Sequence, residues 1–372
     1  MGSVGFFVWL SLHQAAINDA RAEEGKPPRE KEESSEKVLV WPDLVYSEFL
    51  ALILLSVFLI VWAVAIEAPL EPPANPNRTP NPSKAPWYFL GLQEMLVYFD
   101  PWLAGVVFPI FIVKGLIAIP YIDRNPKGAG YYTLRDRGFI IPFFLFGFVI
   151  LWVLLIYLGT FLRGPNWNFF GPFEPWDKNA HPVLNNVNLS EIFWVMLLNQ
   201  RIDVLPEFVR EAPGLLALAF YFGVGPALGP FVFKRIWPGK ETFPRSALAV
   251  LGILIVLTSG CFLVDRSLGQ QIDVRKAALD ATDAAQNDAY WAEMVAMQKT
   301  RAMLQLGMIG LTIGSMMVLT GIACRHFMEE LGFLRYSLAV FFCQFMLLLV
   351  MKMLLRWLLN LKYLVAIQKW NV

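Results

Sequence analysis

The chain is short of charged residues, and that shortage excludes whole classes of protein. Only 16% of its 372 residues are charged and 56% are hydrophobic, whereas soluble domains carry charge on about a quarter of their residues. Apolar runs of roughly twenty residues recur, each long enough to cross a bilayer as a helix. The formal net charge of +1 leaves no basic surplus to neutralise phosphates, which argues against nucleic acid as a partner. The sequence predicts an all-α integral membrane protein.

Cysteine and histidine are also scarce, which limits the cofactors that the chain can hold. The three cysteines lack close partners in sequence and no Cys-x-x-Cys-His occurs, so covalent haem attachment is excluded. The three histidines, His13, His181 and His326, all lie outside the predicted spans. A b-type haem buried between helices needs imidazole ligands inside the membrane. We therefore expect no haem in this chain and assign no metal site.

Seven apolar segments are candidate membrane spans, with bounds good to a few residues. They are Leu44–Ile66, Pro101–Pro120, Gly138–Leu162, Pro213–Trp237, Ser246–Val264, Met303–Cys324 and Leu338–Leu359. Basic residues concentrate in 21–37, 124–137 and 234–245, which share one side of the membrane if all seven segments cross. The positive-inside rule then predicts a cytoplasmic N-terminus and a periplasmic C-terminus.

The distribution of apolar, charged, proline and tryptophan residues divides the sequence into three parts. Residues 1–37 form a cytoplasmic N-terminal segment, and residues 38–212 hold three spans with long outer loops rich in proline and tryptophan. Residues 213–372 hold four spans with short connections, interrupted by the polar stretch 265–302. Its helical spacing predicts a helix or helical hairpin in the periplasm. Lys352, near the end of the last span, is interpreted as an interfacial anchor.

The most informative segment is Glu67–Gly105, which reads EAPLEPPANPNRTPNPSKAPWYFLGLQEMLVYFDPWLAG. It opens with a proline-rich strap that favours extended backbone over helix. Pro86 then stands where a helix tolerates its missing N–H. We expect an amphipathic helix from Trp87 to about Phe99 at the membrane interface, the depth that tryptophan and tyrosine prefer.

This loop, followed by DPWLAGVVFP, IPYIDRNPKG and FLRGPNWNF, resembles the C-terminal part of cytochrome b. The same unit is a separate three-span chain, subunit IV, in chloroplast-type cytochrome bf complexes, and the likeness is strongest to bacterial split forms. It covers roughly Val38 to Trp167. The resemblance implies a subunit of a proton-translocating quinol–cytochrome c oxidoreductase in the bacterial cytoplasmic membrane. It also implies that the loop lines the quinol-oxidation site on the periplasmic side.

The resemblance further implies cofactors and partners. The substrate would be menaquinol or ubiquinol, while haem b and a Rieske iron–sulfur cluster would belong to other chains. Expected partners are a haem-binding cytochrome b N-terminal subunit, the Rieske protein, a cytochrome c subunit and membrane lipid, with a terminal oxidase as a further candidate. Any enzymatic activity would belong to the assembled complex.

The sequence departs from the family pattern where a proton acceptor is expected. The family motif reads Pro-Glu-Trp-Tyr, whereas Pro86 stands here at the glutamate position. The nearest acidic residue is Glu94, seven residues after Trp87 and thus on nearly the same helical face. We hypothesise that Glu94 replaces the missing carboxylate as the acceptor of quinol protons. Alternatively, Glu94 merely points to interfacial water.

The aromatic residues beside this position are the other candidates for the site. We expect Tyr88 to help hold the quinol, with Pro86, Trp87 and Phe89 lining the pocket. For Trp87 and Phe89, packing against a partner subunit ranks above contact with the quinone.

Two other functions compete with quinol oxidation. A non-catalytic structural subunit of a respiratory complex or supercomplex would explain the missing glutamate. A transporter built on the last four spans is suggested by the proline-kinked segment Gly223–Pro230 and by Lys352. The spans lack the intramembrane acidic residues that proton-coupled carriers commonly use, so the transporter ranks below the other two.

Overall fold

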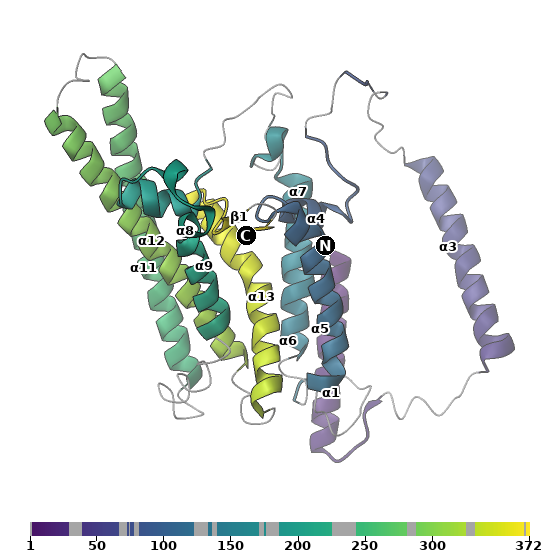
Figure 1. Ribbon diagram of the computed structural model, residues 1–372. Coiled ribbons are helices and arrows are strands. Elements are labelled where there is room, and N and C mark those ends of the chain that lie inside the picture. The colour runs from purple at the N-terminus through teal and green to yellow at the C-terminus, as the bar shows by residue number, and fades with distance from the viewer. Residues whose placement is uncertain are drawn as a thin grey trace. The chain divides into compact units, whose positions relative to one another are not determined.

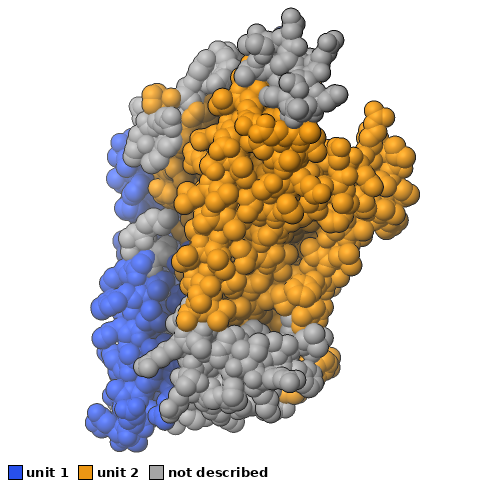
Figure 2. All heavy atoms as spheres, turned by 90° about the vertical axis from the view of Figure 1, so that its left-hand side faces the viewer, with its two compact units in different colours: residues 1–83, 125–149 blue, residues 84–124, 150–372 orange. Residues whose placement is uncertain are grey.

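The computed structural model describes most of the chain and resolves it into two compact units. The described residues are 2–29, 39–66, 73, 75–77, 82–122, 133–135, 140–170, 175, 186–224, 243–280, 288–324, 332–367 and 370–372. Unit 1 comprises residues 1–83 and 125–149, and unit 2 comprises residues 84–124 and 150–372 (Figure 2). Most of the proline-rich strap lies outside the described residues.

Unit 1 contains two long helices. The first is α1 (Gly2–Glu23). The second begins with the π-helical stretch Val40–Leu44 and continues as α3 (Val45–Ala65). None of the residues of α3 is buried. A helix that is apolar on every side and satisfies its own backbone hydrogen bonds is suited to a lipid environment.

Unit 2 begins with the short helix α4 (Leu90–Met95), followed by a π-helical stretch, Leu103–Val107, and α5 (Phe108–Ile122). The next span begins in unit 1 with α6 (Ile140–Phe144), continues through a π-helical stretch, and ends in unit 2 with α7 (Val153–Phe161).

Two glycines let α4 and α7 approach closely. A Cβ at Gly159 would lie 3.3 Å from the carbonyl oxygen of Leu90, and one at Gly91 would lie 3.4 Å from atoms of Trp152 and Ile156. Larger residues at either position would push α4 away from α7.

The remainder of unit 2 is a helical bundle with a small hairpin (Figure 1). Its elements are Glu191–Leu197 (π-helical), Ile202–Val204 (3₁₀), α8 (Glu207–Arg210), α9 (Ala212–Ala219) with Phe220–Val224, α11 (Phe243–Asp280), α12 (Asp288–Cys324), α13 (Gly332–Leu359), β1 (Ala366–Ile367) and β2 (Trp370–Asn371). In Figure 1, α11 and α12 lie side by side, and α12 also packs on α13.

Six helices among the described residues are long and apolar enough to cross a membrane. They are Val40–Ala65, Leu103–Ile122, Ile140–Phe161, Ala249–Ala277, Trp291–Ile322 and Gly332–Leu359. The predicted span Pro213–Trp237 appears as a shorter apolar helix, Ala212–Val224, and its second half lies outside the described residues. The prediction of an all-α, multi-pass membrane protein is confirmed.

The polar stretch 265–302 is helical wherever it is described, because its ends belong to α11 and α12. At 38 residues, α11 is about 57 Å long, well beyond the roughly 30 Å of a bilayer core. One end of the α11–α12 pair therefore projects past any bilayer that its apolar part spans.

An aromatic cluster holds α5 and α13 together. The ring of Phe345 lies 4.1 Å from that of Phe111 and 4.6 Å from that of Phe108, centroid to centroid.

Farther along α13, Lys352 is fully buried. Its interpretation as an anchor at the membrane interface is wrong, because the side chain faces the interior of unit 2.

Candidate functional site

The residues Pro86–Phe89 form a tight turn that leads into α4, here called the aromatic turn. The backbone N–H of Phe89 donates to the carbonyl of Pro86 over 2.8 Å. The side chains of Trp87, Tyr88 and Phe89 are 68%, 51% and 51% exposed. Three adjacent aromatic rings with this much open surface offer a large apolar face to a ligand or a partner chain.

Polar contacts on both sides fix the aromatic turn to its surroundings. The N–H of Ala85 donates to the side-chain oxygen of Gln93 over 2.9 Å, which closes the turn onto α4. The ammonium of Lys84 donates to the carbonyl of Thr160 over 2.8 Å, which ties the turn to α7. Partial burial lowers the pKa of Lys84. The turn is thus exposed in its rings but held at both ends.

Behind the aromatic turn, Glu94 forms a buried ion pair with Arg163. The two side chains are 0% and 4% exposed. The Arg163 Nε donates to Glu94 Oε2 over 2.9 Å, and Nη2 donates to Oε1. Tyr98 donates its hydroxyl to Oε1 and Trp167 its indole N–H to Oε2, both over 2.9 Å. Both carboxylate oxygens are therefore occupied by donors, and Glu94 does not face interfacial water in this structure.

The turn after α7 holds Arg163 in place. Its Nη1 donates to the carbonyl of Trp167 over 2.8 Å, and its guanidinium lies 3.9 Å from the ring centre of Phe169. Asn166 and Trp167 adopt positive φ angles of 52° and 57°. This conformation is uncommon for asparagine and rare for a bulky residue such as tryptophan, so it is maintained by surrounding interactions. The indole bond to Glu94 is one of them.

The phenol of Tyr98 acts as a permanent donor in this network. Burial, followed by the charge of the neighbouring Glu94 carboxylate, raises the pKa of Tyr98 well above its ordinary value. The hydroxyl therefore stays protonated at physiological pH and keeps its hydrogen bond to Glu94.

The sequence predicted that Trp87 and Glu94 would lie on nearly the same face of one helix, but the structure places them in different environments. Trp87 is exposed whereas Glu94 is fully buried. The reason is local: the expected helix from Trp87 to Phe99 is α-helical only over α4, with tighter turns on either side. The rotation per residue therefore differs from that of a continuous α-helix.

Sequence reasoning missed Arg163, Trp167 and Tyr98 as partners of Glu94. One signal was available, because Arg163 is a basic residue directly after the third span, on the side where the positive-inside rule disfavours basic residues. Such a residue needs a compensating partner. Finding which acid supplies it required the fold.

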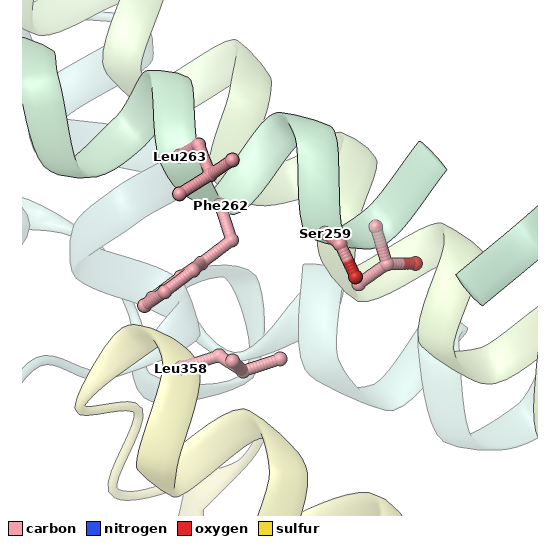
Figure 3. Close-up of a pocket in the computed structure, with 5 residues that line it drawn as sticks. Ser259, Phe262, Leu263 and Leu358 are labelled. Atoms are coloured by element: carbon pink, nitrogen blue, oxygen red, sulfur yellow. The ribbon is translucent and has the colours of Figure 1, made fainter. Parts of the chain in front are cut away.

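Among the described residues we find no second cluster of side chains typical of a catalytic or metal-binding site. Within this part of the chain, no group of three or more histidine, cysteine or acidic residues could hold a metal ion, and His181 and His326 lie outside that part. A pocket of about 200 Å³ is lined by Thr258, Ser259, Phe262, Leu263 and Leu358. Phe262 points from α11 toward Leu358 of α13 (Figure 3). The walls of this pocket are mainly apolar, and none of the predicted site residues lines the pocket.

Comparison with known protein families gives a match over part of the chain. Residues 73–173 match the family model described as Cytochrome b(C-terminal)/b6/petD. No curated protein and no solved structure matches the chain. The matched range contains the aromatic turn, Glu94 and Arg163, and it confirms the resemblance drawn from the sequence motifs.

Proposed function

We propose that this chain, whose residues 73–173 match the cytochrome b C-terminal family model, forms one wall of the quinol-oxidation site of a quinol–cytochrome c oxidoreductase. The family suggests a membrane subunit of a bc- or b6f-type complex, with a cytochrome b N-terminal subunit as partner. In this proposal the chain lies in the bacterial cytoplasmic membrane with its N-terminus in the cytoplasm. The aromatic turn then lies on the periplasmic side.

One observation supports the proposal most strongly. The aromatic turn is exposed, and the residues beneath it, here called its base, are held together by the buried Glu94–Arg163 ion pair. A quinol head group is a flat ring with polar oxygens, and it binds best between apolar or aromatic faces with few placed polar groups. Trp87 and Phe89 supply such faces, and the Tyr88 hydroxyl supplies a hydrogen-bonding group. The Glu94–Arg163 pair and the Lys84 bond hold the base in one geometry, which favours binding by preorganisation.

The chemistry divides between this chain and its partners. Oxidation of one quinol releases two electrons and two protons. The haem b and the Rieske cluster, on other chains, would take the electrons one each, and the protons would leave to the periplasm. This chain would orient the quinol through Tyr88, with Pro86, Trp87 and Phe89 around the ring.

Glu94 is the proposed proton acceptor, provided that one of its present hydrogen-bond donors is displaced. Its oxygens already accept hydrogen bonds from Arg163, Tyr98 and Trp167. A proton from quinol can reach the carboxylate only if one donor is displaced.

The second candidate is a non-catalytic structural subunit, and the same network favours it. A carboxylate whose oxygens are all engaged also serves as an anchor, and Pro86 at the motif position accepts no proton. In that case the pair only holds α4 against the turn after α7. No observation on the described residues favours a transporter.

A quinone-analogue titration distinguishes the two candidates. In the purified complex, an analogue bound at the proposed site shifts the absorption spectrum of the partner's haem b. Tyr88→Phe removes one hydrogen bond, worth about 1 kcal/mol, and should weaken analogue binding about fivefold. Tyr46→Phe, an exposed tyrosine of α3, is the matched control and should leave it unchanged. A wild-type complex that shows no shift at saturating analogue would favour the structural subunit.

A further inference from the structure

The last part of the chain, the segment 361–372, is described over residues 361–367 and 370–372, and it meets the residues that follow α4. Asn371 donates its side-chain N–H to Asp100 Oδ2 over 2.8 Å. In return, the backbone N–H of Asp100 donates to the carbonyl of Asn371 over 3.3 Å. These two residues are 271 positions apart, yet their reciprocal bonds join the end of the bundle to the candidate site.

The segment is fixed in turn by α13. The buried ammonium of Lys352 donates to the carbonyl of Lys362 over 2.7 Å. The same ammonium lies 5.9 Å from the ring centre of Phe99 and 5.8 Å from that of Tyr363. A lysine buried inside a membrane helix is costly, and such residues commonly mark a function. Here its one charge contacts both the 361–372 segment and the residue next to Asp100.

Two further attachments hold the segment from its other side. The N–H of Ala366 donates to the buried carboxylate of Glu211 over 2.8 Å. The backbone of Leu364 lies so close to Gly214 that a Cβ there would overlap its carbonyl oxygen. The segment therefore cannot shift without breaking contacts with the start of α9.

The contacts continue from Asp100 to the aromatic turn. Phe99 is buried, and its ring lies 4.8 Å from that of Phe108. Tyr98 is also buried and donates to Glu94. Ten residues separate Phe89 from Asp100, and they form turns and one short helix rather than a flexible loop. A displacement of Asp100 is therefore transmitted to α4.

We propose that the segment 361–372 is a positioning element of the quinol site, with Asn371 and Lys352 as positioning residues. This inference rests on the proposed function. It gives the part of the chain after residue 212 a role in the site itself: the segment sets the position of α4, and hence the affinity of the aromatic turn for quinol. Neither residue contacts the substrate.

The Asp100–Asn371 pair provides the test, because its hydrogen bond can be rebuilt with the roles exchanged. In the purified complex, Asn371→Ala should raise the quinol KM about tenfold, with kcat changed less than about twofold, since a hydrogen bond to a charged group is lost. The double variant Asp100→Asn/Asn371→Asp restores a donor and an acceptor and should return KM to within about threefold of wild type. Asp273→Asn, an exposed residue of α11, is the control and should leave KM unchanged.

Hydrogen–deuterium exchange gives a readout that does not depend on activity. Asn371→Ala should speed exchange of the backbone amides in residues 87–100, and the exchanged pair should restore their protection. Unchanged exchange and unchanged KM in Asn371→Ala would overturn the inference, as would a double variant no better than the single one. A wild-type complex that oxidises no quinol would instead count against the proposed function, while the exchange comparison would still decide whether the segment positions α4.

Discussion

Removing the charge of Glu94 should destabilise the chain strongly while leaving the shape of the side chain almost unchanged. In Glu94→Gln the amide retains one oxygen that accepts hydrogen bonds, so part of the bonding to Tyr98 and Trp167 can persist. The guanidinium of Arg163, 4% exposed, is then left buried without its counter-charge. Breaking a buried ion pair on one side costs about 3–5 kcal/mol, which lowers the folding equilibrium constant by roughly a hundredfold to several thousandfold.

A double-mutant cycle isolates the ion pair from the other bonds. Arg163→Gln alone leaves the Glu94 carboxylate buried and unpaired, and it should cost a similar amount. The double variant Glu94→Gln/Arg163→Gln buries two neutral amides and should recover most of the loss, because neutral replacements of buried pairs are often tolerated. The expected coupling free energy is about 3 kcal/mol, measured by denaturant unfolding of the purified chain in detergent.

The same cycle addresses the chemical role of Glu94. If Glu94 accepts the quinol proton, the double variant assembles with its partners but oxidises quinol far more slowly than wild type. If Glu94 is only an anchor, quinol oxidation returns together with stability. Single variants within about 0.5 kcal/mol of wild type, with additive effects in the double variant, would refute the reasoning that the buried pair holds α4 in place.

Three further predictions concern single positions. Gly214→Ala should lower the melting temperature of the chain by several degrees although alanine favours helix, because the new Cβ would overlap the carbonyl of Leu364. The raised pKa of Tyr98 means that the folded state holds a proton that the unfolded state releases above about pH 10. Stability should therefore fall as the pH rises past that value, and Tyr98→Phe should reduce this alkaline loss in unfolding measurements at pH 8 to 11. Trp87→Ala should leave the unfolding free energy of the chain within about 0.5 kcal/mol, because the side chain is exposed, but should weaken binding of a quinone analogue to the assembled complex.

The membrane helices were readable from the sequence because lipid imposes a simple rule. A span needs about twenty apolar residues and an internally bonded backbone, and α13 ends at Leu359 as predicted. The starts of the spans do not coincide with the starts of the helices: α12 begins at Asp288, before the predicted span start Met303, within the stretch 265–302 that helical spacing predicted. Hydropathy detects only the part of a helix that lipid would surround, so the polar extensions of α11 and α12 were predicted from helical spacing instead.

The candidate site was readable only in part, for a different reason. The aromatic turn is a contiguous motif and could be located from four letters of sequence. The partner of Glu94 could not, since Arg163 is 69 positions away and the pairing depends on how α4 packs against α7. The same holds for Lys352, whose burial follows from the packing of Phe99 and the 361–372 segment rather than from any local pattern.

The most direct test of the account is a cryo-electron microscopy map of the intact complex with a quinone analogue bound. The account predicts density for the analogue ring against Trp87, Tyr88 and Phe89, within electron-transfer distance of the haem b of the partner subunit. A map in which these three rings are covered by protein or lipid, with no cleft that admits a ring and no redox centre nearby, would contradict it.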